Sequence, residues 1–315
     1  MLRAVWDGSQ LRVRDINAGS LFHFEEHDLK TSLDVTADIL PLCEALQASI
    51  YITYGPMMRV AVFHLPEKDT VLIVIHHLVV DGVSWRIIAE DLNRIYVTLL
   101  QGRLSVNLPK RKCSFAQYAQ ALNDYAGSSA LREEEGYWQN VVDRINSNET
   151  LSRGRSGEVS YVSFQSDDSV SSLLLGEGYR KFGFDINALL LTALSCAWKT
   201  VTGQTFISVA MEGHGREPFG SHPLELERLV GWFTSIYPVA LLFEDSDFKT
   251  QVAAVQTMLQ KIPNKGLDYG ILSHIKLKES LRCKPLMTFN YLGSFEESGS
   301  DGIFTFDNTL PQGSS

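Results

Sequence analysis

The sequence predicts an α/β protein with mixed sheets in two lobes, and three observations lead to that prediction. Short apolar, β-rich stretches alternate with amphipathic helical stretches along the chain. A polar, glycine-bearing segment at 146–158 has no periodicity and divides the 315 residues almost in half. Each half also ends an apolar strand in a polar loop that carries glycine and ionisable side chains. We therefore predict an N-terminal lobe at 1–150 and a C-terminal lobe at 151–315.

Turn and cap signals place the elements of the first half. Asp7-Gly8 is a hairpin turn signal. Pro41 weakens the first predicted helix, because proline removes an interior hydrogen bond. Ser114 and Gln117 have capping-box spacing and open a later helix. The predicted elements are a hairpin over 2–16, a strand at 22–24, a helix over 34–49, an antiparallel hairpin over 57–75, and helices over 84–100, 114–126 and 130–144.

The second half repeats the alternation of strand and helix. Asp185 can cap a long helix that Gly203 ends. Beyond residue 295 the sequence turns to Ser, Gly, Asp and Asn and predicts little structure. The predicted elements are a strand at 159–164, helices over 169–182 and 186–201, a strand at 206–211, a helix over 247–262 and a strand at 286–292.

Composition excludes several classes of function. The net charge of −9 argues against nucleic acid as a partner, because binding phosphates needs clustered Lys and Arg. No apolar run is long enough to span a bilayer, and the start has no signal-peptide core. The cysteines lack C-x-x-C or metal-ligand spacing, which indicates reduced thiols in a cytoplasmic protein. They are Cys43, Cys113, Cys196 and Cys283.

Two adjacent histidines, His76 and His77, end the apolar run at 71–75 and precede Asp81-Gly82. Side chains alternate across a strand, so one histidine is expected to face the interior and the other a cavity. A histidine at a strand-to-helix junction suits proton transfer, since its unperturbed pKa is about 6.5. A histidine pair alone is more often structural. A metal site is not favoured either, because adjacent strand side chains diverge and no third ligand is evident.

A second group of ionisable residues, Glu-Gly-His-Gly-Arg-Glu at 212–217, follows the strand at 206–211. Most such loops are solvated charged turns. Glu212 comes first after the apolar strand, so we expect it to be held rigidly and partly desolvated, and burial raises the pKa of a carboxylate. A histidine in one half and a carboxylate in the other suit removal of a proton from carbon on one face and its return on the opposite face.

Five motifs together resemble one protein family. HHLVVDGVSWRIIAEDL at 76–92 resembles the signature of the condensation-domain superfamily of nonribosomal peptide synthetases, in the variant of its epimerization branch. Condensation domains proper are similar in fold but typically lack the glutamate of EGHGRE. The other motifs follow in the order seen in epimerization domains: EGHGRE at 212–217, VGWFTSIYPV at 230–239, PNKGLDYG at 263–270 and FNYLG at 289–293.

The resemblance implies a fold and a role for five residues of the first motif. The fold is two chloramphenicol-acetyltransferase-like lobes arranged as a V, with the active-site channel between them. His77 is expected to face this channel, and His76 to be its structural partner. Asp81 is expected to organise the loop through ionic and hydrogen-bond contacts. Gly82 lets the backbone turn close to the channel, and Ser84 belongs to the same active-site loop.

The resemblance also implies the chemistry. Glu212 matches the catalytic glutamate of the family. Asn290 and Tyr291 match polar residues that orient the thioester or stabilise an enolate-like intermediate. The implied reaction is epimerization, L to D and back, at the α-carbon of an aminoacyl or peptidyl thioester. Whether His77 or Glu212 takes the L-side proton is left open.

The implied substrate and partners follow from the same family. The substrate hangs from the 4'-phosphopantetheine arm of an upstream peptidyl carrier domain, and no metal or redox cofactor is bound. Adenylation and condensation domains of the same synthetase are the other expected partners, without nucleic acid or membrane.

Two departures from the family keep alternatives open. The helical opening segment of the family and the strands after FNYLG have no counterpart here, so the resemblance implies truncation at both ends. One alternative is a condensation-type acyltransferase, in which His77 helps an amine attack a thioester. The other is a catalytically inactive fragment that docks carrier domains.

Overall fold

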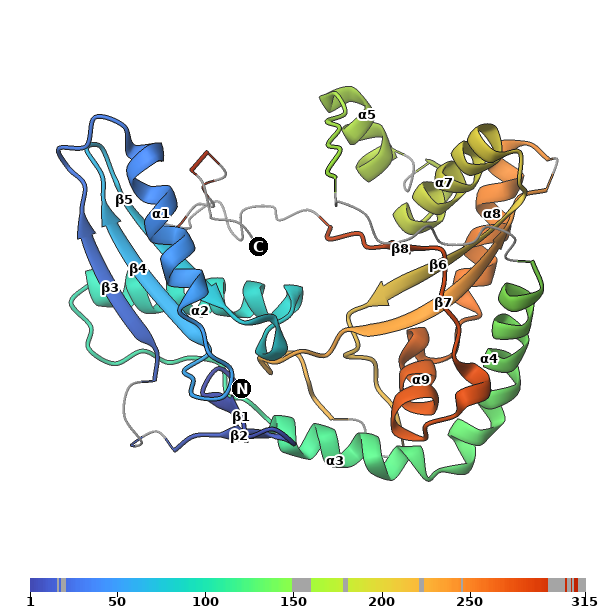
Figure 1. The fold of residues 1–315 in the computed structure, drawn as a ribbon, viewed down its shortest axis with the longest axis horizontal. Helices are drawn as coiled ribbons and strands as arrows, with labels where there is room; N and C mark the ends of the chain where they lie inside the picture. Colours follow the sequence, from blue (N-terminus) through green and yellow to red (C-terminus); the bar gives the residue numbers. More distant parts are fainter. Residues whose placement is uncertain are drawn as a thin grey trace. The chain divides into compact units, whose positions relative to one another are not determined.

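The chain forms two compact α/β units, as the alternation of strands and helices predicts (Figure 1). Unit 1 contains Met1–Tyr118, Leu224–Phe233 and Leu292–Ser315, and unit 2 contains Ala119–Pro223 and Thr234–Tyr291. The computed structural model describes residues 1–15, 17, 21–148, 160–177, 181–220, 224–244, 246–293, 304, 307, 309 and 310.

The first division of the chain falls after Tyr118, not at the predicted boundary near residue 150. The reason is the helix α4 (Ser129–Asn148), which belongs to unit 2. Its Trp138 is fully buried, with ring contacts to Tyr237 and Tyr269. An amphipathic helix joins the core that receives its apolar face, and periodicity alone does not say which core that is.

Unit 1 is built on a three-stranded sheet of order β3-β4-β5, with β3 parallel and β5 antiparallel to β4. A separate antiparallel pair, β1-β2, forms the predicted first hairpin. The predicted hairpin over 57–75 is confirmed as β4-β5. The elements are β1 (Ala4–Trp6), β2 (Leu11–Val13), β3 (His23–Asp28), α1 (Val35–Ala48), β4 (Met58–His64), β5 (Asp69–Ile75), a 3-10 turn (His77–Val79) and α2 (Gly82–Leu100), followed by α3 (Phe115–Ala126), which runs from unit 1 into unit 2.

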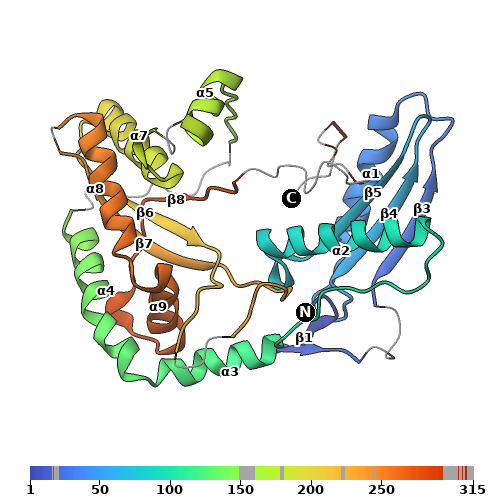
Figure 2. The ribbon, with the colours of Figure 1, turned by 180° about the vertical axis from the view of Figure 1, so that it is seen from behind.

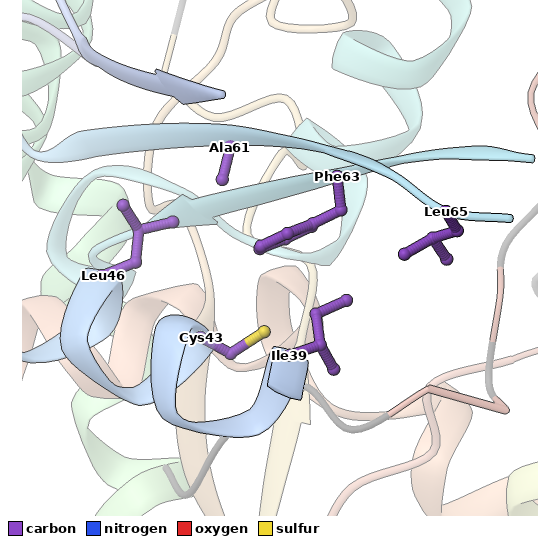
Figure 3. Packing of buried hydrophobic residues seen from close by; sticks show 6 residues of the cluster. All are labelled: Ile39, Cys43, Leu46, Ala61, Phe63 and Leu65. Atoms are coloured by element: carbon purple, nitrogen blue, oxygen red, sulfur yellow. The ribbon is translucent and has the colours of Figure 1, made fainter. Parts of the chain in front are cut away.

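Helices α1 and α2 lie on opposite faces of this sheet (Figures 1 and 2). Buried side chains of α1 face those of β4 and the residue after it, as Figure 3 shows. Helix α1 continues through Pro41. An interior proline costs about 3 kcal/mol, whereas burying Ile39 and Leu46 contributes about 1.5–3 kcal/mol each. Burial therefore outweighs the proline.

Unit 2 contains a three-stranded sheet of order β7-β6-β8, with β7 antiparallel and β8 parallel to β6. Helices α7 and α8 pack on each other and α7 contacts β6, while α4 and α9 contact β7. The elements besides α4 are α5 (Asp168–Ser172), a π-helical turn (Leu173–Glu177), α7 (Ile186–Thr202), β6 (Phe206–Gly213), β7 (Ser235–Leu242), α8 (Phe248–Gln260), a 3-10 turn (Pro263–Gly266), α9 (Leu267–Gly270), a π-helical turn (Ile271–Ile275), a 3-10 turn (Glu279–Leu281) and β8 (Met287–Phe289).

Several predictions for the second half are corrected. The polar segment at 146–158, expected to link the two halves without regular structure, is helical up to Asn148, and 149–158 lies outside the described residues. The predicted strand at 159–164 is not formed over 160–164. A strand needs a hydrogen-bonded neighbour, and no strand in the described residues pairs with this segment. Its apolar side chains are 88%, 96% and 92% exposed at Tyr161, Val162 and Phe164.

Two further elements differ from the prediction. The helix expected over 169–182 changes to a π-helical turn at Leu173 and contains Gly176, a poor helix former, and 178–180 lies outside the described residues. The last strand ends at Phe289, before Asn290. In the described part of the chain, no helix has both the length and the apolar character that a membrane span requires.

A histidine links the three strands of the unit 1 sheet and predicts a pH dependence. His64 Nε2 lies 2.7 Å from Glu26 Oε1 on β3, and Nδ1 lies 2.7 Å from Asp69 Oδ1 on β5. The hydrogen bond with Glu26, then that with Asp69, raises the pKa of His64. Since this pKa is higher in the folded chain, the stabilisation is present below about pH 6.5 and is lost as pH rises through the folded-state pKa.

We therefore expect the difference in Tm between the wild type and His64→Gln to be larger at about pH 6 than at about pH 9. Thermal unfolding followed by circular dichroism at both pH values measures it. His274→Gln, in unit 2, is the control and leaves the pH dependence unchanged. An equal Tm difference for His64→Gln at both pH values would contradict the role of His64.

Candidate active site

The two histidines of the first motif follow β5 and are not part of it. The strand ends at Ile75, His76 caps the 3-10 turn and His77 is its first residue. The alternation of strand side chains therefore does not apply to them. His76 is half-buried and its Nδ1 accepts a hydrogen bond from the Leu78 N–H at 3.2 Å. His77 is exposed. The turn still gives one local, structural histidine and one histidine open to solvent.

Asp81 ties this loop to a distant segment of unit 1. It is the N-cap of α2, and its Oδ1 accepts from the Ser84 N–H at 2.7 Å. Its Oδ2 accepts from the Phe233 N–H at 3.2 Å. A buried carboxylate needs hydrogen-bond donors, and both oxygens of this one have a backbone donor. The arrangement matches the organising role that the resemblance implies for Asp81.

Ser84 makes a second, two-point connection to the same segment. Its side chain is fully buried, at 0% exposure. Its Oγ donates to the Gly231 carbonyl at 2.9 Å and accepts from the Gly231 N–H at 3.1 Å. A Cβ on Gly231 would lie 2.7 Å from the ring of Phe115, so this close approach requires glycine. The segment is thus held by both polar and van der Waals contacts.

Ion pairs anchor the earlier part of segment 224–233. Glu225 pairs with Lys112. Arg228 pairs with Glu90 and Asp91 on α2. The segment therefore belongs to unit 1 although its neighbours in sequence belong to unit 2.

The Trp232 ring contacts the ring of His77, the exposed histidine of the pair. The ring centroids of His77 and Trp232 lie 5.3 Å apart, with an interplanar angle of 61°. Trp232 is 41% exposed, so packing against buried residues covers only part of its side chain. Its two neighbours, Gly231 and Phe233, are the residues that Ser84 and Asp81 bind.

The backbone at Gly82 does not itself require glycine, and the expected closeness of this turn to a channel stays a prediction. It is the first residue of α2, is exposed, and a Cβ there would meet nothing within 4 Å. Its φ lies outside the left-handed region. The turn is made by the capping carboxylate of Asp81, so the backbone does not require glycine at this position.

In unit 2, Glu212 and Asn290 are brought together by strand register. β6 and β8 run parallel, with Met211 opposite Phe289, so the next residues along the two strands are Glu212 and Asn290. Asn290 Nδ2 donates to Glu212 Oε2 at 2.8 Å. Glu212 is half-buried and Asn290 is exposed. The carboxylate is therefore oriented by a neighbouring strand end while it keeps access to solvent.

The backbone beside Glu212 is closely packed. A Cβ on Gly213 would lie 2.8 Å from Ser235 Oγ and 3.1 Å from the Lys265 carbonyl oxygen. Gly266 has a φ of +86°, and a Cβ there would lie 1.8 Å from an atom of the Tyr237 ring. The glycines of two motifs thus let the 263–266 turn lie against the end of β6.

A buried polar network holds this turn. Asn264 Nδ2 donates to both carboxylate oxygens of Asp268 at 3.0 Å and to the Tyr125 hydroxyl oxygen at 3.1 Å. Burial raises the pKa of Asp268. Burial, and then the charge of Asp268, raises the pKa of Tyr125 to about 12. Asn264 itself has a φ of 39°, which asparagine tolerates better than most residues.

The remaining residues of these motifs have local roles. His214 Nε2 lies 3.0 Å from Glu217 Oε1, and its Nδ1 accepts from the Arg216 N–H at 3.1 Å, so this histidine has contacts within the EGHGRE loop. Tyr291 is half-buried and follows Asn290, and no hydrogen bond of its hydroxyl is found among the described residues.

The structure thus gathers several predicted residues into one group in each unit. His77, Asp81 and Ser84 contact segment 224–233, and Glu212 and Asn290 lie at one end of the β6-β8 pair. The pairing of His77 with Glu212 stays a prediction. Trp232 and Gly231 had no predicted role, and their only signal was that VGWFTSIYPV was one of the five motifs.

Comparison with known proteins bears directly on the family. The condensation domain family model matches residues 2–309. Surfactin synthase subunit 1 of Bacillus subtilis (strain 168) is 36% identical over 283 residues, which are 86% of this chain and 8% of that protein. Tyrocidine synthase 2 of Brevibacillus parabrevis is 35% identical over 324 residues, covering 97% of this chain and 9% of that protein. The chain spans less than a tenth of these relatives.

Solved structures agree in fold. The epimerization domain from the third module of tyrocidine synthetase B is 34% identical with a TM-score of 0.85, over 99% of this chain and 72% of that one. The first condensation domain of the calcium-dependent antibiotic synthetase shares the fold at 16% identity and a TM-score of 0.66, over 84% of this chain and 58% of that one. The family match over nearly all its residues shows that this chain belongs to the condensation-domain family of nonribosomal peptide synthetases.

Proposed function

We propose that this chain is an epimerase domain, an isomerase that inverts the α-carbon of an aminoacyl or peptidyl thioester. The thioester is carried on the 4'-phosphopantetheine arm of a carrier domain. His77 and Glu212 are the proton-transfer groups, and Asn290 and Tyr291 are the polar residues near the reacting centre.

The observation that carries the proposal is the carboxylate of Glu212, which the Asn290 amide orients at 2.8 Å. A peptide-bond-forming site needs one general base, and it has no use for a second ionisable group. An inverting site needs two, because the proton leaves one face of the carbon and returns to the other. The 34% identity to a solved epimerization domain supports the same reading.

The proposed chemistry balances without an added reactant. One group takes the α-proton, the electron pair moves into the thioester carbonyl as an enolate, and the other group delivers a proton to the opposite face. A thioester suits this step because its α-proton is more acidic than that of an amide. The two stereoisomers have similar free energies, so both directions are catalysed.

Deuterium incorporation tests the proposal. An aminoacyl group is loaded onto a phosphopantetheinylated carrier protein and incubated with the chain in deuterated buffer. Deuterium at the α-carbon and the D/L ratio are measured after thioester cleavage, with untreated loaded carrier as the control. We expect exchange with inversion. Absence of exchange with both aminoacyl and peptidyl loads would reject the reaction.

A condensation-type acyl transfer is the second candidate, because the matching family model is that of the condensation domain. It predicts no exchange and formation of a dipeptidyl carrier when an aminoacyl acceptor carrier is added. A third outcome, carrier binding without either reaction, would identify a docking role. Mass spectrometry of the carrier in the same mixture separates the two reactions, and co-elution of the carrier with the chain in size-exclusion chromatography measures binding.

A further inference from the structure

We infer that Ser84 is a positioning residue for His77, acting through Gly231 and Trp232. The inference rests on the proposed function in one respect, which is that His77 transfers a proton. The contacts that carry it all lie within unit 1.

The first step is how Ser84 holds Gly231. Its hydroxyl donates to the carbonyl and accepts from the N–H of the same residue, at 2.9 and 3.1 Å. Two bonds to one residue restrict both its distance and its orientation. Because Ser84 is fully buried, water does not compete readily for these bonds.

The second step is that Trp232 is held on both sides. Gly231 is bound by Ser84, and the Phe233 N–H donates to Asp81 Oδ2 at 3.2 Å. The Phe233 side chain is buried with aromatic contacts to Phe115, at a centroid distance of 5.3 Å. The backbone of Trp232 is therefore fixed by its neighbours.

The third step is that the Trp232 side chain depends on this backbone. It is 41% exposed, so packing alone restricts it weakly, yet its ring lies 5.3 Å from that of His77. His77 is itself exposed. An exposed imidazole has several accessible rotamers, and an adjacent indole reduces their number. Proton transfer requires the reacting groups within hydrogen-bond reach, so a restricted imidazole favours it.

Ser84→Ala tests the inference, with Ser195→Ala as the matched control. Ser195 is also a buried helical serine, and its Oγ donates to the Leu191 carbonyl at 2.9 Å within unit 2. The first readout is the chemical shift of the His77 ring protons, which an adjacent indole perturbs. We expect Ser84→Ala to move these resonances toward their positions in Trp232→Leu, and Ser195→Ala to leave them unchanged.

The second readout is α-proton exchange on the loaded carrier. We expect Ser84→Ala to lower kcat about tenfold through the lost buried hydrogen bonds. KM for the loaded carrier should change little, because the Ser84 side chain is fully buried and cannot itself contact a carrier. In a Trp232→Leu background, Ser84→Ala is expected to cause no further loss of kcat, since both substitutions act on the same contact between Trp232 and His77. Independent, multiplicative losses would overturn the inference.

The two readouts separate this inference from the proposed function. If the wild type shows no exchange, the proposed function fails, while the His77 resonances still test the positioning. Unchanged His77 resonances in folded Ser84→Ala would overturn the positioning alone. If Ser84→Ala does not fold, Asp81→Asn provides the same test, because Asp81 binds Phe233, the residue that follows Trp232. Asparagine can keep the bond to the Ser84 N–H but loses the acceptor for the Phe233 N–H.

Discussion

Glu212→Gln is expected to lower α-proton exchange by about 10²–10⁴-fold, the usual contribution of a general acid or base. Glutamine has nearly the same size, and its carbonyl oxygen can still accept from Asn290 Nδ2, so the geometry of the β6-β8 end is retained. What it loses is the ability to take up a proton. Single-turnover exchange on a loaded carrier in deuterated buffer measures the loss.

The matched control is Glu217→Gln, in the same motif. Glu217 pairs with His214 and not with Asn290, so we expect exchange to remain within a few fold of the wild type. His77→Ala is expected to match the loss of Glu212→Gln. Glu212→Gln with full exchange would exclude Glu212 as a proton-transfer group. Intact dipeptide formation in that variant, without exchange in the wild type, would favour the condensation reaction.

Trp138→Ala is expected to cost about 3–5 kcal/mol of unfolding free energy. Trp138 is the largest fully buried side chain of the described residues, at 0% exposure. Its ring centroid lies 5.0 Å from that of Tyr137, 5.2 Å from that of Tyr269 and 6.2 Å from that of Tyr237. The substitution would leave a cavity where α4 meets β7 and α9, and these surroundings can refill it only in part.

Urea unfolding measures the loss of unfolding free energy. Amide hydrogen exchange shows which elements are destabilised. A chain of two units need not unfold in one step, so exchange is followed peptide by peptide. We expect faster exchange in α4 and β7 and little change in β4 and β5. Trp232→Ala is the control for stability, because that ring is 41% exposed and loses less apolar contact. Equal destabilisation by the two substitutions, or faster exchange confined to unit 1, would contradict the assignment of α4 to unit 2.

Many element boundaries could be predicted because their signals are local. Asp185 accepts from the Asn187 N–H and caps α7, and Gly203 ends that helix in the left-handed conformation. Ser114 and Gln117 form the reciprocal bonds of a capping box. These interactions join residues two to four positions apart, so the pattern in the sequence contains both partners.

The sequence by itself determined the family, the α/β class and the residue types of the candidate site. Only the tertiary structure decided which residues meet, because the partners lie far apart in the chain. Ser84 and Gly231 are 147 positions apart, and Glu212 and Asn290 are 78 apart. A hydrogen bond between distant residues leaves no periodic trace in either segment. The same reason explains why the sequence pattern does not show that α4 packs in unit 2, and why the strand predicted at 159–164 is not formed over 160–164. Local patterns predict what a segment can form, and its neighbours in space decide what it does form.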